Sequence, residues 1–192
     1  MAETEPVAQP RGPQTARHRI SARALVTLAV VAVLVYGADQ LAKFLVVSNL
    51  NPGERNPVFG ELLQFMFVKN SGAAFSLASG STWIFSIAAS AVTIFIVLFA
   101  HRIRSLAWAV LFGMLLGGTL GNLTDRLLRE PSFGLGHVVD FIQVWGFPAI
   151  FNVADIFIVS SMGLFIILSV RGVRLDGTRA ATTEGDAVPE TK

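Results

Sequence analysis

The chain has 192 residues, of which 53% are hydrophobic and 15% are charged, and its mean hydropathy is +0.60. A soluble domain carries roughly a quarter charged residues, so the composition excludes an ordinary soluble protein and favours a polytopic membrane protein. The net charge of +2 comes mainly from basic clusters beside apolar runs, which indicates membrane topology and argues against a nucleic-acid partner.

Residues 1–20 are predicted to form a disordered arm. Prolines and arginines among small polar residues cannot bury enough apolar surface for this segment to fold. Residues 175–192, which are rich in Thr, Asp and Glu, have the same character. We therefore expect one membrane domain, residues 21–174, between two disordered cytoplasmic segments.

Four apolar segments in this domain predict four transmembrane helices. They cover about residues 24–47, 83–100, 106–123 and 149–170. The last of these would span roughly 33 Å as a helix, enough to cross a bilayer. The first is expected to be retained and not cleaved as a signal peptide, because Tyr36 stands where cleavage after Ala38 would require a small residue.

Basic residues predict the orientation of these helices. Arginines flank the start of the first helix, the connection between the second and third, and the end of the fourth: Arg17, Arg19, Arg23, Arg102, Arg104, Arg171, Arg174 and Arg179. By the positive-inside rule both termini are cytoplasmic, and the connections 48–82 and 124–148 lie outside. Residues 61–70 and 137–145 of these connections are short β-prone runs, which predict a small sheet or interfacial platform at the outer surface.

Ionisable side chains gather at the outer ends of the predicted helices. Such residues are costly at membrane depth and are functional-site candidates by default. Asp39 and Lys43 are four residues apart on one helix face, which is also compatible with a structural ion pair. Asp125 beside Arg126 is compatible with an interfacial anchor that holds a loop.

Amides and glycines add a second pattern in the same region. Asn122 and Asn152 are candidates both for hydrogen bonds between helices and for a direct role in the site. Gly113, Gly117 and Gly121 repeat at every fourth position, which predicts a close-packing face for a neighbouring helix.

Asp140 and Asp155 have no evident basic partner four residues away. An unpaired carboxylate near membrane depth either becomes neutral or shares a proton with a neighbour. Two carboxylates that converge on one water would do this, with one ionised as general base and the other protonated as general acid. Their spacing alone does not establish contact, so on the residues alone this pair is a hypothesis.

Five short strings follow one another along the membrane domain. They are Asp39-Gln40-Leu41-Ala42-Lys43, Asn70-Ser71-Gly72-Ala73-Ala74-Phe75, Gly121-Asn122-Leu123-Thr124-Asp125-Arg126, Val139-Asp140-Phe141 and Phe151-Asn152-Val153-Ala154-Asp155. In order and location the series resembles the motifs of the lipoprotein signal peptidases, also called signal peptidase II, a family of intramembrane aspartic endopeptidases. The resemblance covers about residues 20–172, and five strings in register on a four-helix frame are very specific.

The resemblance implies that Asp140 and Asp155 are the catalytic pair. The implied substrate is a prolipoprotein whose lipobox cysteine carries diacylglycerol, cut just before that cysteine while the acyl chains rest in membrane lipid. The implied fold is an all-α membrane core of four helices with a small outer β-cradle and a lid-like interfacial segment, in the bacterial cytoplasmic membrane. Other positions that would support the site or contact substrate are Asp39, Lys43, Asn70, Gly72, Ala74, Asn122, Asp125, Arg126 and Asn152. We expect a monomer with no cofactor and no metal.

Two other classes of function stay open from the residues. A small proton-coupled transporter would relay protons through Asp39, Asp125 and Asp155. Against it, the acidic residues gather at one face, and no internal repeat of the kind seen in many carriers is visible. A purely structural scaffold would leave the outer carboxylates unexplained.

A serine peptidase is the remaining alternative. It would use Ser71 or Ser76, activated by Lys69 or Lys43. Adjacent residues on a strand point to opposite faces, which argues against a pair of Lys69 and Ser71. The chain contains no cysteine, which excludes a cysteine nucleophile, and its three histidines show no metal-ligand spacing.

Overall fold

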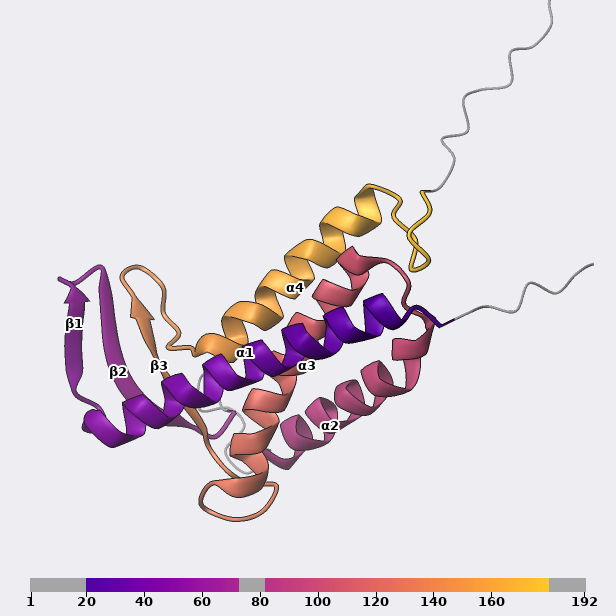
Figure 1. Ribbon diagram of the computed structural model, residues 1–192. Coiled ribbons are helices and arrows are strands. Elements are labelled where there is room, and N and C mark those ends of the chain that lie inside the picture. Colours follow the sequence, from indigo (N-terminus) through magenta and orange to yellow (C-terminus); the bar gives the residue numbers. More distant parts are fainter. Residues whose placement is uncertain (1–19, 73–81, 180–192) are drawn as a thin grey trace, which may run out of the picture.

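A computed structural model of the chain describes residues 20–72 and 82–179 and consists of a helical bundle with a small sheet at one end (Figure 1). The helices are α1 (Ala22–Asn49), α2 (Thr82–Phe99), α3 (Leu106–Leu128) and α4 (Val153–Val170), and the 3-10 helix η2 (Ala100–Arg102) follows α2. The four α-helices are each long and apolar enough to cross a membrane, so the prediction of a multi-pass membrane protein is confirmed. We call the end of the bundle beside the sheet the sheet end, and the opposite end, where η2 lies, the terminal end.

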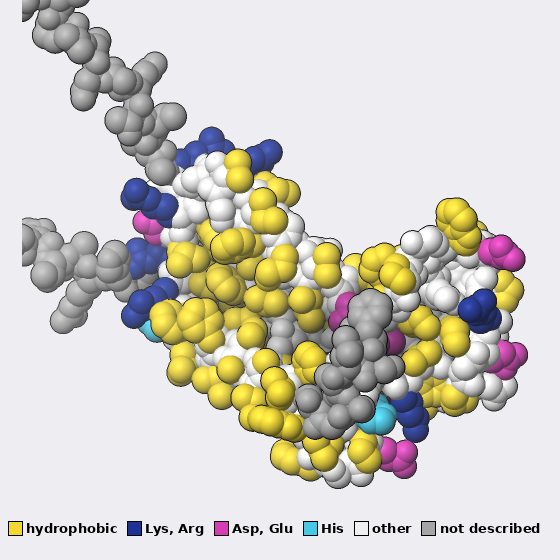
Figure 2. Space-filling model, turned by 180° about the vertical axis from the view of Figure 1, so that it is seen from behind, with side chains coloured by type: hydrophobic (Ala, Val, Ile, Leu, Met, Phe, Trp, Pro, Cys, Tyr) yellow, Lys and Arg dark blue, Asp and Glu magenta, His cyan; other side chains and the backbone are white. Residues whose placement is uncertain are grey.

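α3 is the central helix of the bundle. α1, α2 and α4 all pack against it. In the apolar stretch of α3, 61% of the residues are buried, compared with 28% or less in the apolar stretches of the other three helices. The outward faces of those three helices are apolar. Val33, Ile87 and Val159, for example, are 68%, 60% and 69% exposed, and hydrophobic side chains cover the surface of the bundle in Figure 2. This arrangement suits helices that face lipid.

Glycines on α3 allow it to approach α1 closely. A Cβ atom at Gly113 would lie 2.8 Å from the carbonyl oxygen of Leu28, and one at Gly117 would lie 2.8 Å from the Cβ atom of Val35. Both distances are shorter than real side-chain contacts, so only glycine fits at these positions. The predicted packing face is confirmed.

The sheet has three antiparallel strands in the order β1-β2-β3, namely β1 (Arg55–Phe59), β2 (Leu63–Asn70) and β3 (Val138–Val144). β2 and β3 confirm the two predicted β-prone runs, whereas β1 goes beyond the prediction. β1 contains Pro57, which weakens the strand signal but is tolerated on an edge strand. In the register of β2 and β3, Val68 pairs with Asp140 and Asn70 with Val138. Asp140 and Asn70 therefore face the same side of the sheet.

α3 is longer than predicted. It continues past Leu123 through the polar residues to Leu128. Hydropathy places the end of a membrane helix at the first charges, but here Asp125 and Arg129, four residues apart, pair along the helix and extend it. The polar residues after Leu123 therefore project from a regular helix and not from a loop.

α4 is shorter than predicted. It begins at Val153 and not near Ala149, because the backbone of Phe151 bonds to that of Ile142 beside the sheet and Asn152 caps the helix. The apolar residues before Asn152 thus extend the sheet region. Asp155 consequently lies in the first turn of α4 and not a turn and a half inside it.

The described chain continues past the predicted domain boundary at residue 174. Val173 bridges to Arg179, and the carbonyl oxygen of Leu175 accepts hydrogen bonds from the N–H groups of Arg104 and Ser105 at 2.9 and 3.0 Å. Residues 173–179 therefore form a hairpin against the α2–α3 connection. Residues 1–19, 73–81 and 180–192 lie outside the described part of the chain. The predicted arm and tail fall largely there, and the lid-like interfacial segment is not identified among the described elements, so these remain predictions.

Candidate active site

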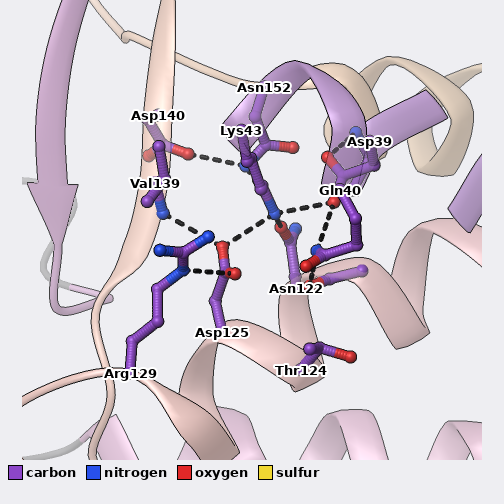
Figure 3. A network of polar contacts seen from close by, with 12 residues as sticks. Asp39, Gln40, Lys43, Asn122, Thr124, Asp125, Arg129, Val139, Asp140 and Asn152 are labelled. Atoms are coloured by element: carbon purple, nitrogen blue, oxygen red, sulfur yellow. Dashed lines mark hydrogen bonds and ion pairs between the residues drawn. The ribbon is translucent and has the colours of Figure 1, made fainter. Parts of the chain in front are cut away.

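Side chains from α1, α3, β3 and α4 meet in one polar network at the sheet end (Figure 3). Lys43 of α1 lies at its centre. Its Nζ lies 2.8 Å from Asp39 Oδ2 and 2.9 Å from Asp125 Oδ2, and it donates a hydrogen bond to Asn122 Oδ1 at 2.9 Å. The lysine is fully buried, and each of its three N–H donors has a partner. The predicted ion pair of Asp39 and Lys43 is confirmed. The partners of Lys43 among the described residues do not include Ser71, and Ser76, the other serine candidate, lies outside them.

Asp125 anchors β3 to α3. Its Oδ2 accepts a hydrogen bond from the N–H of Val139 at 3.1 Å in addition to its contact with Lys43, and its Oδ1 accepts one from Arg129 Nε at 2.7 Å. An anchoring role for Asp125 was predicted, but with Arg126 beside it. The partner is Arg129, because residues four apart share a helix face and adjacent residues do not.

The amide of Asn122 has only one workable orientation. Lys43 offers donors and no acceptor, so the amide oxygen of Asn122 must face it. The amide nitrogen is thereby directed to Asp155 Oδ1, at 2.8 Å. The same amide oxygen also accepts a hydrogen bond from Asn152 Nδ2 at 3.1 Å.

Asn152 joins the two aspartates predicted as a pair. Its Nδ2 donates to Asp140 Oδ1 at 2.7 Å, and its Oδ1 accepts from the N–H of Asp155 at 3.0 Å. Its own N–H donates to Asp155 Oδ2 at 3.2 Å, which completes a capping box at the start of α4. Asn152 is fully buried and so holds both side chains in one place. Asp140 and Asp155, which we call the carboxylate pair, are brought together although they lie on different elements.

Asp140 carries a perturbed pKa. Burial raises the pKa of this carboxyl to about 6, and the nearby charge of Asp155 acts in the same direction. Hydrogen bonds from Asn70 Nδ2, at 2.7 Å, and from Asn152 oppose the rise but do not cancel it. Asn70 is itself held by the N–H of Gly72, which donates to its Oδ1 at 2.8 Å.

Phe85 of α2 closes one side of the site. A Cβ atom at Gly72 would lie 2.6 Å from its ring, and the backbone of Gly72 has a φ of +93°, so both space and conformation require glycine there. The guanidinium of Arg126 lies 5.6 Å from the centre of the same ring and donates to the carbonyl oxygen of Asn122 at 3.3 Å. It lies within Coulombic range of both members of the carboxylate pair. Its Nε has no hydrogen-bond partner among the described residues, so it has a donor available beside the pair.

Comparison with known proteins identifies the family. A sequence model of the family described as signal peptidase (SPase) II matches residues 31–171, which is most of the chain. The chain belongs to the signal peptidase II family. It is therefore a signal peptidase, and the predicted resemblance is confirmed.

Individual relatives agree with this assignment. The chain is 61% identical over 163 residues to the lipoprotein signal peptidase of Leifsonia xyli, covering 85% of this chain and 76% of that one. It is 43% identical over 152 residues to the lipoprotein signal peptidase of Rhodococcus jostii, covering 79% of this chain and 76% of that one.

Two solved structures described as bacterial membrane enzymes share the fold. Each is 30% identical to this chain and covers 80% of it, with TM-scores of 0.68 and 0.69. The matched parts are 92% and 97% of those two chains. The predicted combination of four membrane helices with a small sheet is confirmed by these structures and by the described fold.

The site positions expected of a signal peptidase lie together at the sheet end, except that Ala74 is outside the described residues. Two further network residues were not predicted. Gln40 Nε2 donates both to Asp39 Oδ2 and to the carbonyl oxygen of Gly121, each at 3.1 Å, and Arg129 pairs with Asp125. The spacing of four between Asp125 and Arg129 is a usable signal once α3 is extended, whereas no periodicity singles out Gln40. No group of three His, Asp or Glu side chains within residues 20–72 and 82–179 is arranged to hold a metal ion.

Proposed function

We propose that this signal peptidase is an intramembrane aspartic endopeptidase in which Asp140 and Asp155 activate a water molecule. Its substrate would be a diacylglyceryl-modified prolipoprotein, cut immediately before the lipidated cysteine. The observation that carries the proposal is the double contact of Asn152, which bonds to both carboxyl groups and directs them to one place.

The charges around the pair support a single shared proton. The carboxylates of the network are Asp39, Asp125, Asp140 and Asp155, and the cations near them are Lys43, Arg126 and Arg129. Carboxylates therefore exceed cations by one, and one proton on the pair makes the buried cluster neutral. Burial favours neutrality, so the singly protonated pair is the expected resting state.

The roles of the two aspartates follow from their surroundings. Asp140 is 3% exposed and has the raised pKa, so it is the better holder of the proton. Asp155 is only partly buried and would act as the ionised base. It would take a proton from water as the water oxygen attacks the scissile carbonyl carbon. Protonated Asp140 would donate a hydrogen bond to the developing oxyanion and keep its proton. The proton that Asp155 takes from water would pass to the leaving amine.

Groups beside the pair are suited to holding the peptide. Arg126 presents a donor without a partner among the described residues, which can bond a substrate carbonyl. Asn70 is the last residue of β2 and Gly72 follows the strand, both close to Asp140, so an extended peptide could lie at this end of the sheet. Ala74 is assigned to substrate contact by resemblance alone.

The lipid anchor would set the depth of the cut. The carboxylate pair lies at one end of the lipid-facing helices, so acyl chains in the bilayer would hold the scissile bond at that level and turn binding energy into positioning. We place the sheet end at the outer face of the bacterial cytoplasmic membrane and both termini inside, on the strength of the arginines at the terminal end. The same clustering of carboxylates at one end argues against a proton-coupled carrier. We expect the monomer to be the active unit.

The test is cleavage of a diacylglyceryl-modified prolipoprotein by the purified full-length protein, with the product identified by mass spectrometry. Asp140→Asn and Asp155→Asn keep the size and shape of the side chain but replace the ionisable carboxyl group by an amide, so each should reduce cleavage by about 10⁴-fold or more. Glu54→Gln is the matched control, because Glu54 is exposed and its side chain bonds, among the described residues, only to nearby Asn51.

Retained cleavage in either aspartate variant would rule out the aspartic mechanism. A product that does not begin with the lipidated cysteine would rule out the cut site and leave the mechanism standing. A chelator should leave the rate unchanged, since the proposed chemistry uses no metal.

A further inference from the structure

A basic cavity lies at the terminal end, across the bundle from the carboxylate pair. Its volume is about 770 Å³, and it is lined by the α2–α3 connection, the start of α3 and the hairpin 173–179. Arg102, Arg104 and Arg174 line it together with His101, and Trp108 and Leu175 form part of its apolar wall. Figure 2 shows Lys and Arg side chains gathered at this end of the molecule.

These arginines differ from the cations at the sheet end in forming no ion pair within the part of the chain that the structure describes. The ion pairs among the described residues involve Lys43, Lys69 and Arg129, and none involves an arginine of the cavity. The cavity has one carboxylate in its lining, Asp176, which forms none of these ion pairs but still offsets part of the positive charge. Its Oδ1 accepts hydrogen bonds from the N–H and the hydroxyl of Thr178, at 2.9 and 2.7 Å.

The cavity is held open by the backbone. The N–H groups of Arg104 and Ser105 both donate to the carbonyl oxygen of Leu175, and the indole Nε1 of Trp108 donates to that of Val173 at 3.0 Å. These bonds join segments about 70 residues apart in the sequence, so the arginines are placed by the fold and not by chance proximity along the chain. Arg102 is further held with its guanidinium 4.9 Å from the centre of the Phe99 ring.

We propose that this cavity binds the phosphate-bearing headgroup of an anionic phospholipid. Guanidinium groups match phosphate oxygens with paired N–H donors, and three of them line this cavity against the single carboxylate of Asp176, which leaves the cavity with an excess of positive charge. Basic pockets between membrane helices at the level of the headgroups have this ligand chemistry. The neighbouring end of α4 is apolar and outward-facing, with Val170 83% exposed, so acyl chains attached to the headgroup have a surface to follow.

The bound lipid would reinforce a junction that the protein already makes through the hydrogen bonds to Val173 and Leu175. One phosphate contacted by Arg102, Arg104 and Arg174 links the α2–α3 connection to the end of α4. The lipid would therefore stabilise the terminal end, and it would do so far from the carboxylate pair. Its binding is thus separable from cleavage and does not depend on the proposed mechanism.

The experiment is native mass spectrometry of the full-length protein in detergent, titrated with phosphatidylglycerol or with phosphatidylcholine of the same acyl chains. The unsubstituted protein should bind phosphatidylglycerol about tenfold or more tightly than phosphatidylcholine. Replacing Arg102, Arg104 and Arg174 together by Gln should remove this preference, since each basic group near a lipid surface contributes several-fold to affinity. Replacing the same three by Lys keeps the charge, and should retain part of the preference while losing the paired donors.

The matched control replaces Arg23, Arg171 and Arg179 by Gln. These arginines lie at the same end of the bundle, and their replacement removes the same charge. They do not line the cavity, so the preference for phosphatidylglycerol should survive. Equal loss in the control would mean general attraction to a basic surface and would overturn the site. Unaltered lipid preference in the cavity variant, or competition by glycerol 3-phosphate as strong as by the intact lipid, would also overturn the proposal. So would a preference that appears only after removal of residues 180–192, because the acidic tail would then be the occupant.

Discussion

Charged side chains differ in burial and in ion pairing between the two ends of the bundle. At the sheet end, Lys43 is fully buried and contacts two carboxylates and an amide, so that every donor is used. At the terminal end, the arginines of the cavity line an open space and form no ion pair among the described residues.

This difference separates two uses of a charged side chain. A buried and fully paired charge fixes geometry, because moving either partner leaves an uncompensated charge in a medium that cannot solvate it. An unpaired charge at the membrane surface remains available to solvent, lipid and the membrane potential. Substitutions should therefore be severe at the sheet end and mild at the terminal end.

The largest effect is expected from Lys43→Met. The substitution leaves Asp39 and Asp125 buried without their shared cation, which should lower the free energy of unfolding by about 3–5 kcal/mol and abolish cleavage. Thermal unfolding in detergent and the cleavage assay measure the two effects. Lys69→Met is the control, since its pair with Glu130, at 3.3 Å, is exposed and should contribute no more than about 1 kcal/mol. Similar losses in the two variants would mean that burial does not decide the outcome.

A smaller loss is expected from Gly121→Ala. The added methyl group would collide with the carboxyl group of Asp39, whose position is held by Lys43 and by the N–H of Ala154 at 2.9 Å. We expect a destabilisation of about 1–3 kcal/mol, together with reduced cleavage. Gly163→Ala on α4 has open space around the new Cβ atom and should leave both properties near those of the unsubstituted protein. A neutral Gly121→Ala variant would show that the network tolerates displacement.

A change in pH dependence is expected from Asn70→Ala. If one shared proton is required, kcat/KM should fall as the pH rises above the pKa of Asp140, which is about 6 in the free protein. The hydrogen bond from Asn70 lowers this pKa, so its removal should move the alkaline limb to higher pH by up to about one unit. Asn56→Ala on β1 serves as the control and should leave the limb in place. A shift to lower pH would contradict the assignment of the proton to Asp140.

The smallest effect is expected from Arg171→Gln at the terminal end. Arg171 is exposed and belongs to no ion pair within the described ranges 20–72 and 82–179, so the free energy of unfolding should change by less than about 0.5 kcal/mol. Cleavage by the purified protein should be unaffected. A loss comparable with that of Gly121→Ala would break the contrast between the two ends.

The helices could be predicted from the sequence because long apolar runs have few alternatives in a membrane. Their ends could not. Hydropathy does not register that Asp125 and Arg129 pair along α3, and it counts the apolar residues before Asn152 as helix although they bond to the sheet. The edge strand β1 carries too weak a pattern, with Pro57 in its middle, to be found without its partner.

The contacts of the site show a similar division. Residue types and strings single out the two aspartates and most of their neighbours, and a spacing of four predicts the pair of Asp39 and Lys43. The bonds from Asn122 to Asp155 and from Asn152 to Asp140 join residues 33 and 12 positions apart, respectively, and require the folded chain. No local rule states that Lys43 fixes the orientation of the Asn122 amide.

That orientation has a consequence for proton transfer within the site. Hydrogen bonds connect Lys43, with its partners Asp39 and Asp125, to the carboxylate pair through the amides of Asn122 and Asn152. An amide N–H donates a hydrogen bond without releasing its proton. The two amides therefore fix the relative positions of the two sets of aspartates, Asp39 with Asp125 and Asp140 with Asp155, but do not relay protons between them.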